Sequence, residues 1–356
     1  MKDCPACKVP QEDTAKFCED CGSSMSGQAV AATESGAGDF AVKSAKSPAT
    51  NLCSNCGAGP TAIDEDGFCT QCGHSRKHPD RDHFEVVLDS KVAGVSDRGI
   101  RHHQNEDYFA IGKGSPLGTD GKPTSETALA LVVCDGVSQS QNPQDGSSIG
   151  ATTARDYLLG AIARGYTSPE TTITEALVEA QKAICTVPFN PAGKNDRGET
   201  IAPAQATIVA ALAQGKRITI GWLGDSRAYW LTGTSCVQIS RDHSWYNEVV
   251  DAGLKTRQEA LADPQAHAIT RSLGAAMDGS NPGVEPSFRT LNLTEKGTLL
   301  VVSDGFWNYA DSEGAVLKLV NDQPAQLDPL SLARRLVQFA YDKGGKDNIT
   351  VVVAKF

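Results

Sequence analysis

Four acidic motifs stand in a fixed order along the chain, each at the end of an apolar, strand-like run or beside one. They read Asn105-Glu106-Asp107, Cys134-Asp135-Gly136, Ser303-Asp304-Gly305 and Asp347-Asn348. Because a strand carries its last residue to the rim of its sheet, each motif places a carboxylate at such a rim. Several rims brought together would hold enough negative oxygen to bind small divalent cations. The sequence therefore predicts a fold in which strands far apart in the chain end at one place.

The length of 356 residues exceeds that of a typical single domain and leaves room for one large body and a smaller module. Apolar residues make up 40% of the chain, as in ordinary globular proteins, and no apolar run approaches the roughly 20 residues that cross a bilayer. The first residues, Met1 to Pro5, do not resemble a cleavable export signal. We therefore expect a cytoplasmic protein without a membrane segment.

The formal net charge is −10 at pH 7, so the chain as a whole repels phosphate backbones. A nucleic-acid partner is therefore not expected. Bound cations would neutralise part of this acidity, because a formal count ignores them.

Eight of the eleven cysteines form four Cys-x-x-Cys pairs near the N-terminus. In a chain without an export signal, this spacing favours thiolate ligation of a metal over disulfides. Two pairs complete one tetrahedral site with no open position, so we predict two structural Zn²⁺ ions. The two ligand sets are Cys4, Cys7, Cys18 and Cys21, and Cys53, Cys56, Cys69 and Cys72.

The predicted domain organisation places these cysteines in two small modules ahead of one large domain. We expect a zinc ribbon at 1–24, a flexible linker rich in Ala, Gly and Ser at 25–50, a second ribbon at 51–74, a charged connector at 75–84 and the large domain at 85–356. The ribbons either dock a partner, expected to be a protein, or form a folded spacer. A third interpretation, a zinc-ribbon adaptor for nucleic acid, is disfavoured because basic residues are scattered and aromatic residues few.

The pattern of apolar residues changes at about residue 84 and predicts alternating groups of strands and helices. Strands are predicted at 85–95, 108–112, 128–134, 206–213, 217–223, 228–231, 235–239, 298–302 and 349–355, and helices at 147–164, 169–185, 245–252, 257–262 and 330–341. Strands come in runs, and helices come in pairs or late. This order favours an α+β fold, a four-layer α-β-β-α sandwich, over a doubly wound parallel sheet.

A site built from carboxylates, a backbone carbonyl and water selects Mg²⁺ or Mn²⁺ over Zn²⁺, which prefers His and Cys. Two such cations sharing a bridging carboxylate and a bridging water would lower the pKa of that water. They would also balance the charge of a phosphoryl group under in-line attack. Hydrolysis of a phosphate ester is the natural use of such a site.

The order of motifs in the large domain resembles the metal-dependent type 2C (PPM) protein serine/threonine phosphatases of bacterial type. The motifs are Ser96-Asp97-Arg98-Gly99, Asn105-Glu106-Asp107, Asp135-Gly136, Gly224-Asp225-Ser226-Arg227, Asp242-His243-Ser244, Ile269-Thr270-Arg271-Ser272-Leu273-Gly274, Ser303-Asp304-Gly305 and Gly345-Lys346-Asp347-Asn348. One motif alone, such as Asp-Gly, would indicate only a turn. The whole order is specific and spans roughly 85–356. The resemblance implies a monomeric enzyme that removes phosphate from phosphoserine and phosphothreonine in protein targets of a serine/threonine kinase.

The resemblance also implies the roles of individual residues. Asp135 would bridge two Mn²⁺ or Mg²⁺ ions, and Asp304 and Asp347 would complete the catalytic set. Asp225 either supports a third metal or is a turn residue that accepts hydrogen bonds from backbone amides. The full set of implied ligands is Glu106, Asp107, Asp135, Gly136, Asp304, Asp347 and Asp225.

Three places depart from the family pattern, and one of them is Ala206-Thr207, where the family usually has a Gly-Thr-Thr-like strand start. Where the family has a phosphate-gripping arginine, this chain has His102, with Arg101 one place earlier. Either Arg101 reaches the phosphate through a bulge, or His102 binds it with a weaker, pH-dependent charge. Val137 stands where eukaryotic members carry a histidine proposed as general acid. Bacterial members also lack that histidine, so the proton for the leaving group would come from metal-bound water or from another group.

The segment 244–273 resembles the short flap that bacterial members carry beside the active site. A flap there would shape substrate choice more than chemistry. The alternative function is a catalytically weak relative that binds phosphoproteins. Its expected mark, loss of metal ligands, is absent from the sequence.

Overall fold

The structure, a computed structural model, describes residues 2–3, 10–11, 59, 62, 81–118, 121–166, 168–194, 198–275, 283–322 and 327–356. The chain divides into two compact units, Met1–Asp80 and Arg81–Phe356. In the first unit, β1 (Lys2–Asp3) and β2 (Pro10–Gln11) pair antiparallel. The eight cysteines predicted to bind zinc lie outside the described residues.

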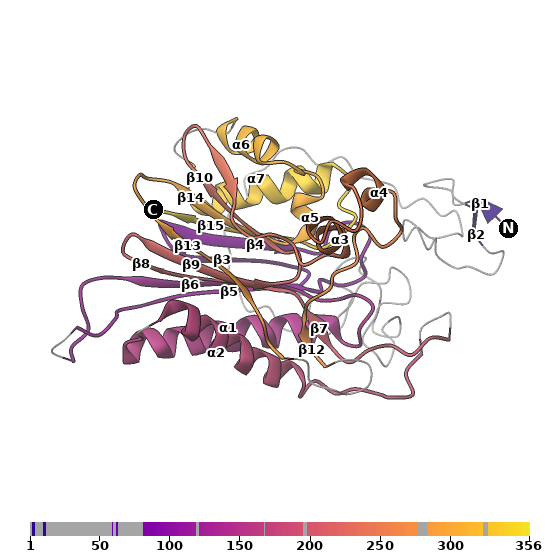
Figure 1. Ribbon diagram of the computed structural model, residues 1–356, viewed down its shortest axis with the longest axis horizontal. Helices are drawn as coiled ribbons and strands as arrows, with labels where there is room; N and C mark the ends of the chain where they lie inside the picture. The colour runs from indigo at the N-terminus through magenta and orange to yellow at the C-terminus, as the bar shows by residue number, and fades with distance from the viewer. Residues whose placement is uncertain are drawn as a thin grey trace. The chain divides into compact units, whose positions relative to one another are not determined.

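The second unit is built on two antiparallel sheets (Figure 1). One sheet has the strand order β11-β10-β14-β15-β4-β3 and the other β13-β9-β8-β6-β5. The strands of the first sheet are β3 (His83–Asp89), β4 (Val92–Asp97), β10 (Arg227–Leu231), β11 (Cys236–Gln238), β14 (Thr298–Val302) and β15 (Ile349–Lys355). Those of the second are β5 (Asp107–Gly114), β6 (Ala128–Asp135), β8 (Ile208–Gln214), β9 (Arg217–Leu223) and β13 (Ser287–Asn292). A short pair, β7 (Gln205–Ala206) and β12 (Leu273–Gly274), forms a sheet of its own, and Ala206 bridges Gly136 just after β6.

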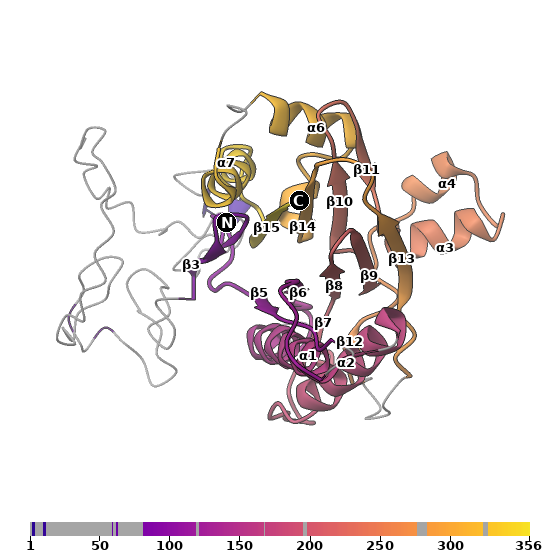
Figure 2. The same cartoon turned by 90° about the vertical axis from the view of Figure 1, so that its left-hand side faces the viewer.

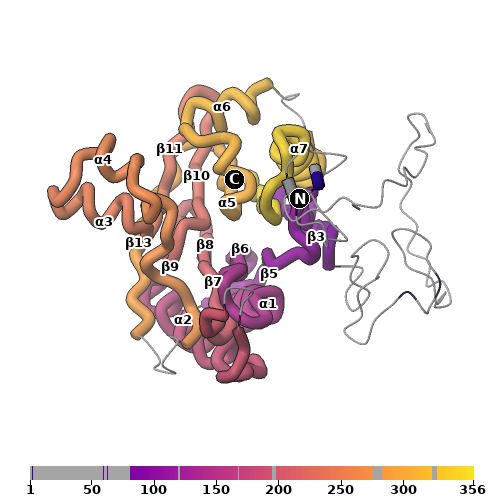
Figure 3. The backbone as a smooth tube through the Cα atoms, turned by 90° about the vertical axis from the view of Figure 1, so that its right-hand side faces the viewer, coloured from indigo at the N-terminus to yellow at the C-terminus, as the bar shows by residue number. Residues whose placement is uncertain are grey.

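Helices cover the outer face of each sheet. The helices α1 (Pro143–Arg164) and α2 (Pro169–Ile184) pack on the five-stranded sheet, and α7 (Pro329–Asp342) packs on the six-stranded sheet. The shorter helices are α3 (Trp245–Asp251), α4 (Arg257–Leu261), α5 (Asp304–Trp307) and α6 (Glu313–Asn321). Figures 2 and 3 show α6 and α7 on one side of the paired sheets, α1 and α2 on the other, and α3 and α4 beside the layers. The prediction of an α+β fold with two sheets flanked by helices is confirmed.

The layers are held together by three clusters of buried apolar side chains. Successive residues of a strand face opposite sides of its sheet. In β6, for example, Val133 faces the cluster between the sheets and Cys134 faces the cluster under α1 and α2. The third cluster lies between the six-stranded sheet and α7 and includes Leu300 and Leu336. Strands buried on both faces are continuous apolar runs, which is why the central strands could be predicted from sequence.

The predicted elements differ from the structure at several places. The predicted strand at 85–95 is two antiparallel strands, β3 and β4, joined at Ser90 and Lys91. The strand β13 and the helices α5 and α6 were not predicted. The side chains of β13 are half-buried or exposed, and its sequence has no continuous apolar run that would predict a strand. The strand is recognised from its hydrogen-bonded pairing with β9. Among the described helices, none combines the length and the apolar character that a membrane crossing would need.

Candidate metal centre

The first two acidic motifs meet at one edge of the five-stranded sheet. Asp107, the first residue of β5, lies opposite Asp135, the last residue of β6, in the antiparallel register. The backbone N–H of Gly136 donates to the carbonyl of Glu106 at 3.1 Å. A Cβ atom on Gly136 would stand 2.7 Å from that carbonyl oxygen and 2.6 Å from the carbonyl oxygen of Pro143. Only glycine therefore allows the two chain segments to approach this closely.

The other two motifs come from neighbouring strands of the six-stranded sheet. Asp304 opens α5 just after β14, and Asp347 precedes β15, which pairs with β14. The loops that carry them are in contact, since a Cβ atom on Gly305 would stand 2.0 Å from the carbonyl oxygen of Asn348. Asp225 lies in the turn between β9 and β10, where the chain passes from one sheet to the other. Both sheets thus deliver carboxylates to one region.

Hydrogen bonds from Asn348 and Ser303 tie the two sheets together at this edge. The Asn348 Oδ1 atom accepts from the N–H of Glu106 at 2.8 Å, and its Nδ2 atom donates to the carbonyls of Arg98 (2.8 Å) and Gln104 (3.1 Å). The Ser303 hydroxyl donates to Asp107 Oδ2 at 2.6 Å and accepts from the N–H of Thr350 at 2.9 Å.

Sequence reasoning placed both residues inside the acidic motifs but assigned a role to neither. Their presence in the Asp347-Asn348 and Ser303-Asp304-Gly305 motifs was the available signal. This signal is weak, because a sequence motif does not show which backbone groups its polar side chains will hydrogen-bond.

The electrostatics of the region show an excess of buried negative charge. Burial, the largest cause, raises the pKa of Asp107 to about 7 and that of Asp225 to about 7, the latter with help from Asp242. Burial raises the pKa of Asp135 well above its usual range, and the charge of Asp107 adds to the effect. The pKa of Asp304 is raised well above its usual range by burial and then by Asp347. The carboxylates are therefore costly to ionise together without a nearby positive charge.

These residues fit a site for hard divalent cations. The Asp107 Oδ1 atom is buried and accepts no hydrogen bond from the described residues, so one carboxylate oxygen is left without compensation. No three His, Cys, Asp or Glu side chains in the described ranges are already closed around a common point. Carboxylates that repel one another are not expected to close until a cation offsets their charge. An all-oxygen donor set of this kind suits Mg²⁺ or Mn²⁺.

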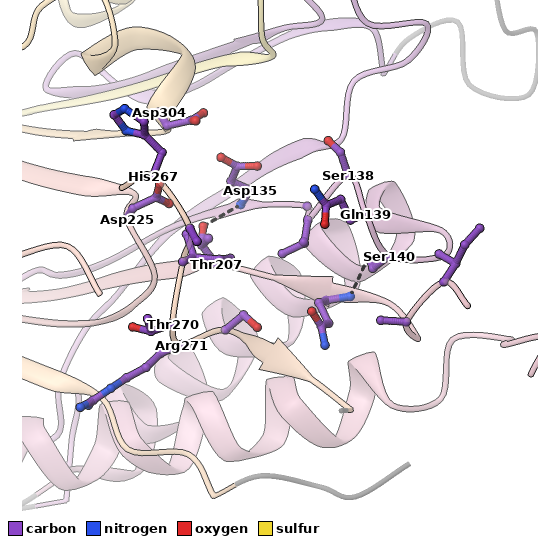
Figure 4. Close-up of a pocket in the computed structure, with 18 of the residues that line it drawn as sticks. Asp135, Ser138, Gln139, Ser140, Thr207, Asp225, His267, Thr270, Arg271 and Asp304 are labelled. Carbon is purple, nitrogen blue, oxygen red and sulfur yellow. Dashed lines mark hydrogen bonds between the residues drawn. The ribbon is translucent and has the colours of Figure 1, made fainter. Parts of the chain in front are cut away.

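The region opens into a cavity of about 1360 Å³ (Figure 4). One wall carries Asp135, Gly136, Asp225, Asp304 and Asp347. The remaining wall comes from residues 137–140, 199–202 and 267–272, with Gln205 and Thr207. Glu106 and Asp107 lie behind the wall, and Glu106 Oε2 accepts from the Ser138 hydroxyl at 2.6 Å. The predicted ligands are thus gathered in one region, with five on the cavity surface and the acidic pair beneath it.

The two residues predicted to bind phosphate lie in different places. His102 Nε2 stands 3.2 Å from Asp347 Oδ1, at the edge of the acidic group. Arg101 is exposed, no contact between it and the acidic group is present among the described residues, and neither Arg101 nor His102 lines the cavity. The geometry therefore favours His102 of the two, and its role in binding phosphate stays a prediction.

The turn that carries Asp225 is held by an aromatic and ionic stack. The Trp307 indole N–H donates to the carbonyl of Asp225 at 2.9 Å. The Arg227 guanidinium lies 3.6 Å from the centre of the Trp307 ring and donates to both carboxylate oxygens of Asp242, at 2.9 and 2.6 Å. Asp225 itself lines the cavity, which a simple turn residue would not need to do.

His243 anchors the same turn and gives a prediction for pH. Its Nδ1 atom accepts from the N–H of Gly224 at 3.2 Å, so the neutral ring carries its proton on Nε2 and donates to the Ser287 hydroxyl at 2.9 Å. Protonation of Nδ1 would break the first bond. Burial of the ring is the largest cause of a lowered pKa, about 4 instead of 6.5.

We expect the folded protein to lose stability as the pH falls from about 6.5 to about 4, because the unfolded chain then binds a proton on His243 that the folded chain rejects. Well above pH 6.5 both states are neutral and this contribution is complete. Between pH 7 and pH 5 the loss should be about 2 kcal/mol. Urea unfolding of the wild type and of His243→Gln at both pH values checks it. The difference in unfolding free energy between the two proteins should be smaller at pH 5 than at pH 7. An equal loss of stability in both proteins would contradict the lowered pKa of His243.

Comparison with known proteins places this geometry in a family context. The family model described as Protein phosphatase 2C matches residues 111–339, which include Asp135, Asp225 and Asp304. The model described as Double zinc ribbon matches residues 4–75. The serine/threonine protein phosphatase PstP of Mycobacterium tuberculosis is 26% identical over 269 residues, 76% of this chain and 45% of that protein. The protein phosphatase PhpP of Streptococcus pneumoniae is 35% identical over 131 residues, 37% of this chain and 50% of that protein.

The chain therefore spans about half the length of these two relatives. The crystal structure of the M. tuberculosis phosphatase PstP/Ppp aligns with a TM-score of 0.57 and 25% identity, over 75% of this chain and 98% of that one. The catalytic domain of PstP in complex with two manganese ions aligns with a TM-score of 0.54 and 24% identity, over 74% and 97% of the two chains. The second likeness is one of fold alone.

Proposed function

Because the chain belongs to the protein phosphatase 2C family, we propose that it hydrolyses phosphoserine and phosphothreonine in proteins with the help of two Mn²⁺ or Mg²⁺ ions. The observation that carries this proposal is the meeting of carboxylates from both sheets at the wall of one open cavity. The same fold in PstP holds two manganese ions, which supports the choice of metal. The substrates would be targets of a serine/threonine kinase.

The residues that would hold the cations come from all four acidic motifs. Asp135 would be shared between the ions because it stands opposite Asp107 and has Asp304 among its charged neighbours. Asp225 would support a third ion. Once bound, the cations would lower the pKa of bound water and offset the charge of the phosphoryl group. The other proposed ligands are Glu106, Asp107, the carbonyl of Gly136, Asp304 and Asp347.

The chain's own residues position the substrate around this centre. His102, beside Asp347, is placed to meet a phosphoryl oxygen. The Ser138 hydroxyl is already paired with Glu106, so it orients this carboxylate and does not contact the substrate. The cavity is wide enough for a peptide side chain to reach the carboxylates from the solvent.

The function is tested by screening phosphoserine, phosphothreonine and phosphotyrosine peptides with Mn²⁺, Mg²⁺ and no metal. Metal-dependent release of phosphate from the first two peptides is expected. Tight binding of these peptides without turnover under any metal would support the alternative, a phosphoprotein-binding relative. If the protein neither bound nor hydrolysed any of the peptides, both functions would be refuted.

We also propose that the double zinc ribbon binds two structural zinc ions and serves as a docking module for a protein partner. Elemental analysis of the washed protein should show two zinc ions per chain, one for each set of four thiolates. Because a small module without a core depends on its metal, removing the zinc should unfold the ribbons and leave the phosphatase domain folded. A zinc content near zero in protein purified without chelator would contradict the ribbon assignment.

A further inference from the structure

The proposed reaction needs a proton for its leaving group. The alkoxide of serine or threonine is nearly as basic as hydroxide, whose parent water has a pKa of about 15.7. A phenol is far more acidic, with a pKa of about 10 for tyrosine, and a nitro group lowers it further. The proton comes either from water bound to the cations or from a side chain at the cavity. A phosphatase acting on serine and threonine therefore gains from a general acid at the cavity.

The residues that line the cavity offer one side chain suited to this task. Val137, which follows the Asp135-Gly136 motif, is apolar and carries no proton to give. Arg271 carries a guanidinium group, and groups of this kind do not give up a proton in proteins. The aspartates are assigned to the cations, Glu199 is engaged in an interaction of its own, and hydroxyl groups are too weakly acidic. Within the described part of the cavity wall, His267 is the one imidazole, and imidazole exchanges protons near neutral pH.

The backbone around His267 is fixed although its ring is free. The preceding residue, Ala266, is buried at 3% exposure, and its N–H donates to the carbonyl of Asp263 at 3.0 Å. The following residue, Ala268, donates to Gln265 at 2.8 Å and accepts from the N–H of Trp245 at 2.9 Å. The His267 side chain is exposed. The backbone at His267 is held by hydrogen bonds while its imidazole is exposed, so the side chain can contact a substrate without a change in the fold.

The direction of the ring agrees with this role. Figure 4 shows His267 at the end of the cavity where Asp225 and Asp304 lie, whereas the Arg271 side chain extends away from these carboxylates. The guanidinium of Arg271 instead donates to the carbonyl of Glu285 at 3.3 Å. His102, the other imidazole near the acidic group, is held by Asp347 and is not part of the cavity wall.

We propose that His267 is the general acid that protonates the departing serine or threonine oxygen, an inference that rests on the proposed phosphatase function. As the oxygen of a water molecule bonds to phosphorus, the bond from phosphorus to the side-chain oxygen breaks and its electron pair moves to that oxygen. The imidazolium N–H supplies the proton that completes the alcohol. The attacking water releases its proton to solvent, and the neutral imidazole regains one from solvent. The products are the alcohol and inorganic phosphate.

The test compares His267→Gln with the wild type on a phosphothreonine peptide and on a series of aryl phosphates of increasing leaving-group basicity. A general acid contributes about 10²- to 10⁴-fold, so kcat for the peptide should fall at least about 100-fold. The KM for the peptide should stay unchanged. Turnover of 4-nitrophenyl phosphate should fall less than about threefold, because its phenolate leaves without a proton. In the variant the rate should therefore depend more steeply on leaving-group basicity.

The matched control is His103→Gln, the same change at an exposed imidazole that does not line the cavity, which should behave as the wild type. Added imidazole should restore peptide turnover to His267→Gly. Equal losses on all substrates, a rise in KM alone or no loss would each overturn the role of His267. A wild type inactive on every substrate would instead refute the proposed function.

Discussion

The Asp304→Asn variant is expected to lose Mn²⁺-dependent hydrolysis of 4-nitrophenyl phosphate while keeping or raising its melting temperature without metal. Asp304 lies at the cavity wall, where burial and the neighbouring Asp347 raise its pKa well above the usual range. An amide cannot ionise, so the metal-free fold avoids the cost of a buried charge at this position, and the amide oxygen can accept the hydrogen bond that Asn308 Nδ2 donates to Asp304 at 3.2 Å. The same change removes a ligand that the cations need.

The size of the loss follows from the role assigned to the metal. Charge stabilisation by a bound cation is worth several kcal/mol, and each ~1.4 kcal/mol is tenfold in rate, so turnover should fall at least about 10³-fold. Steady-state kinetics across a Mn²⁺ titration measures the loss of turnover, and thermal melting in the presence of a chelator measures the stability of the metal-free protein. Asp311→Asn, the same change at an exposed position a few residues later, is the matched control and should be active. Retained turnover in Asp304→Asn would remove Asp304 from the metal shell.

The Asn348→Ala variant is expected to lose both stability and activity. Asn348 is buried at 2% exposure, and its side chain serves three backbone groups, those of Arg98, Gln104 and Glu106. Truncation leaves these groups without a partner in a buried place, which should cost about 2–4 kcal/mol of unfolding free energy. The Glu106 backbone would no longer be held against the neighbouring sheet. Mn²⁺ affinity and turnover should therefore fall together.

Urea denaturation and a Mn²⁺ titration of turnover measure the two effects. Asn348→Asp is the informative contrast, because it keeps the acceptor for the Glu106 N–H and loses both donated bonds. It should be no more stable than Asn348→Ala, because it adds a buried carboxyl group where negative charge is already in excess and sets an oxygen against the carbonyls of Arg98 and Gln104. Asn321→Ala removes a single exposed hydrogen bond to Gly233 and should change little. If Asn348→Ala matched the wild type in stability, these hydrogen bonds would not be what joins the two sheets here.

Much of the fold could be predicted because it depends on local patterns. The central strands appear in the sequence as apolar runs, and α2 begins at Pro169 directly after its N-cap residue Ser168. The elements that were missed lack such patterns. The strand β13 is half exposed and is defined by pairing with β9, and α5 has only four residues. Their identity depends on neighbours that the sequence does not place.

The candidate site could be predicted only as a set of residue types. The carboxylates stood out because each follows or precedes a strand-like run. Which of them reach the cavity could not be predicted, and the structure places Glu106 and Asp107 behind the wall. The choice between Arg101 and His102 also required coordinates, because adjacent residues in a loop can point in opposite directions. The sequence placed His267 within the segment 244–273 that resembles a flap beside the active site, but its position on the cavity wall required the structure.

The sequence by itself determined which chemistry this protein carries. Its signals are paired cysteines, strand-end carboxylates and an ordered series of short motifs. Each depends only on residues close together in the chain, so it can be recognised without knowing the tertiary contacts. Tertiary structure alone decided which groups act together. The hydrogen bond from Glu106 to Asn348 joins positions 242 residues apart, and only the packing of two twisted sheets brings them within 2.8 Å. Long-range proximity arises from the burial of whole strand faces, so no short stretch of sequence records it.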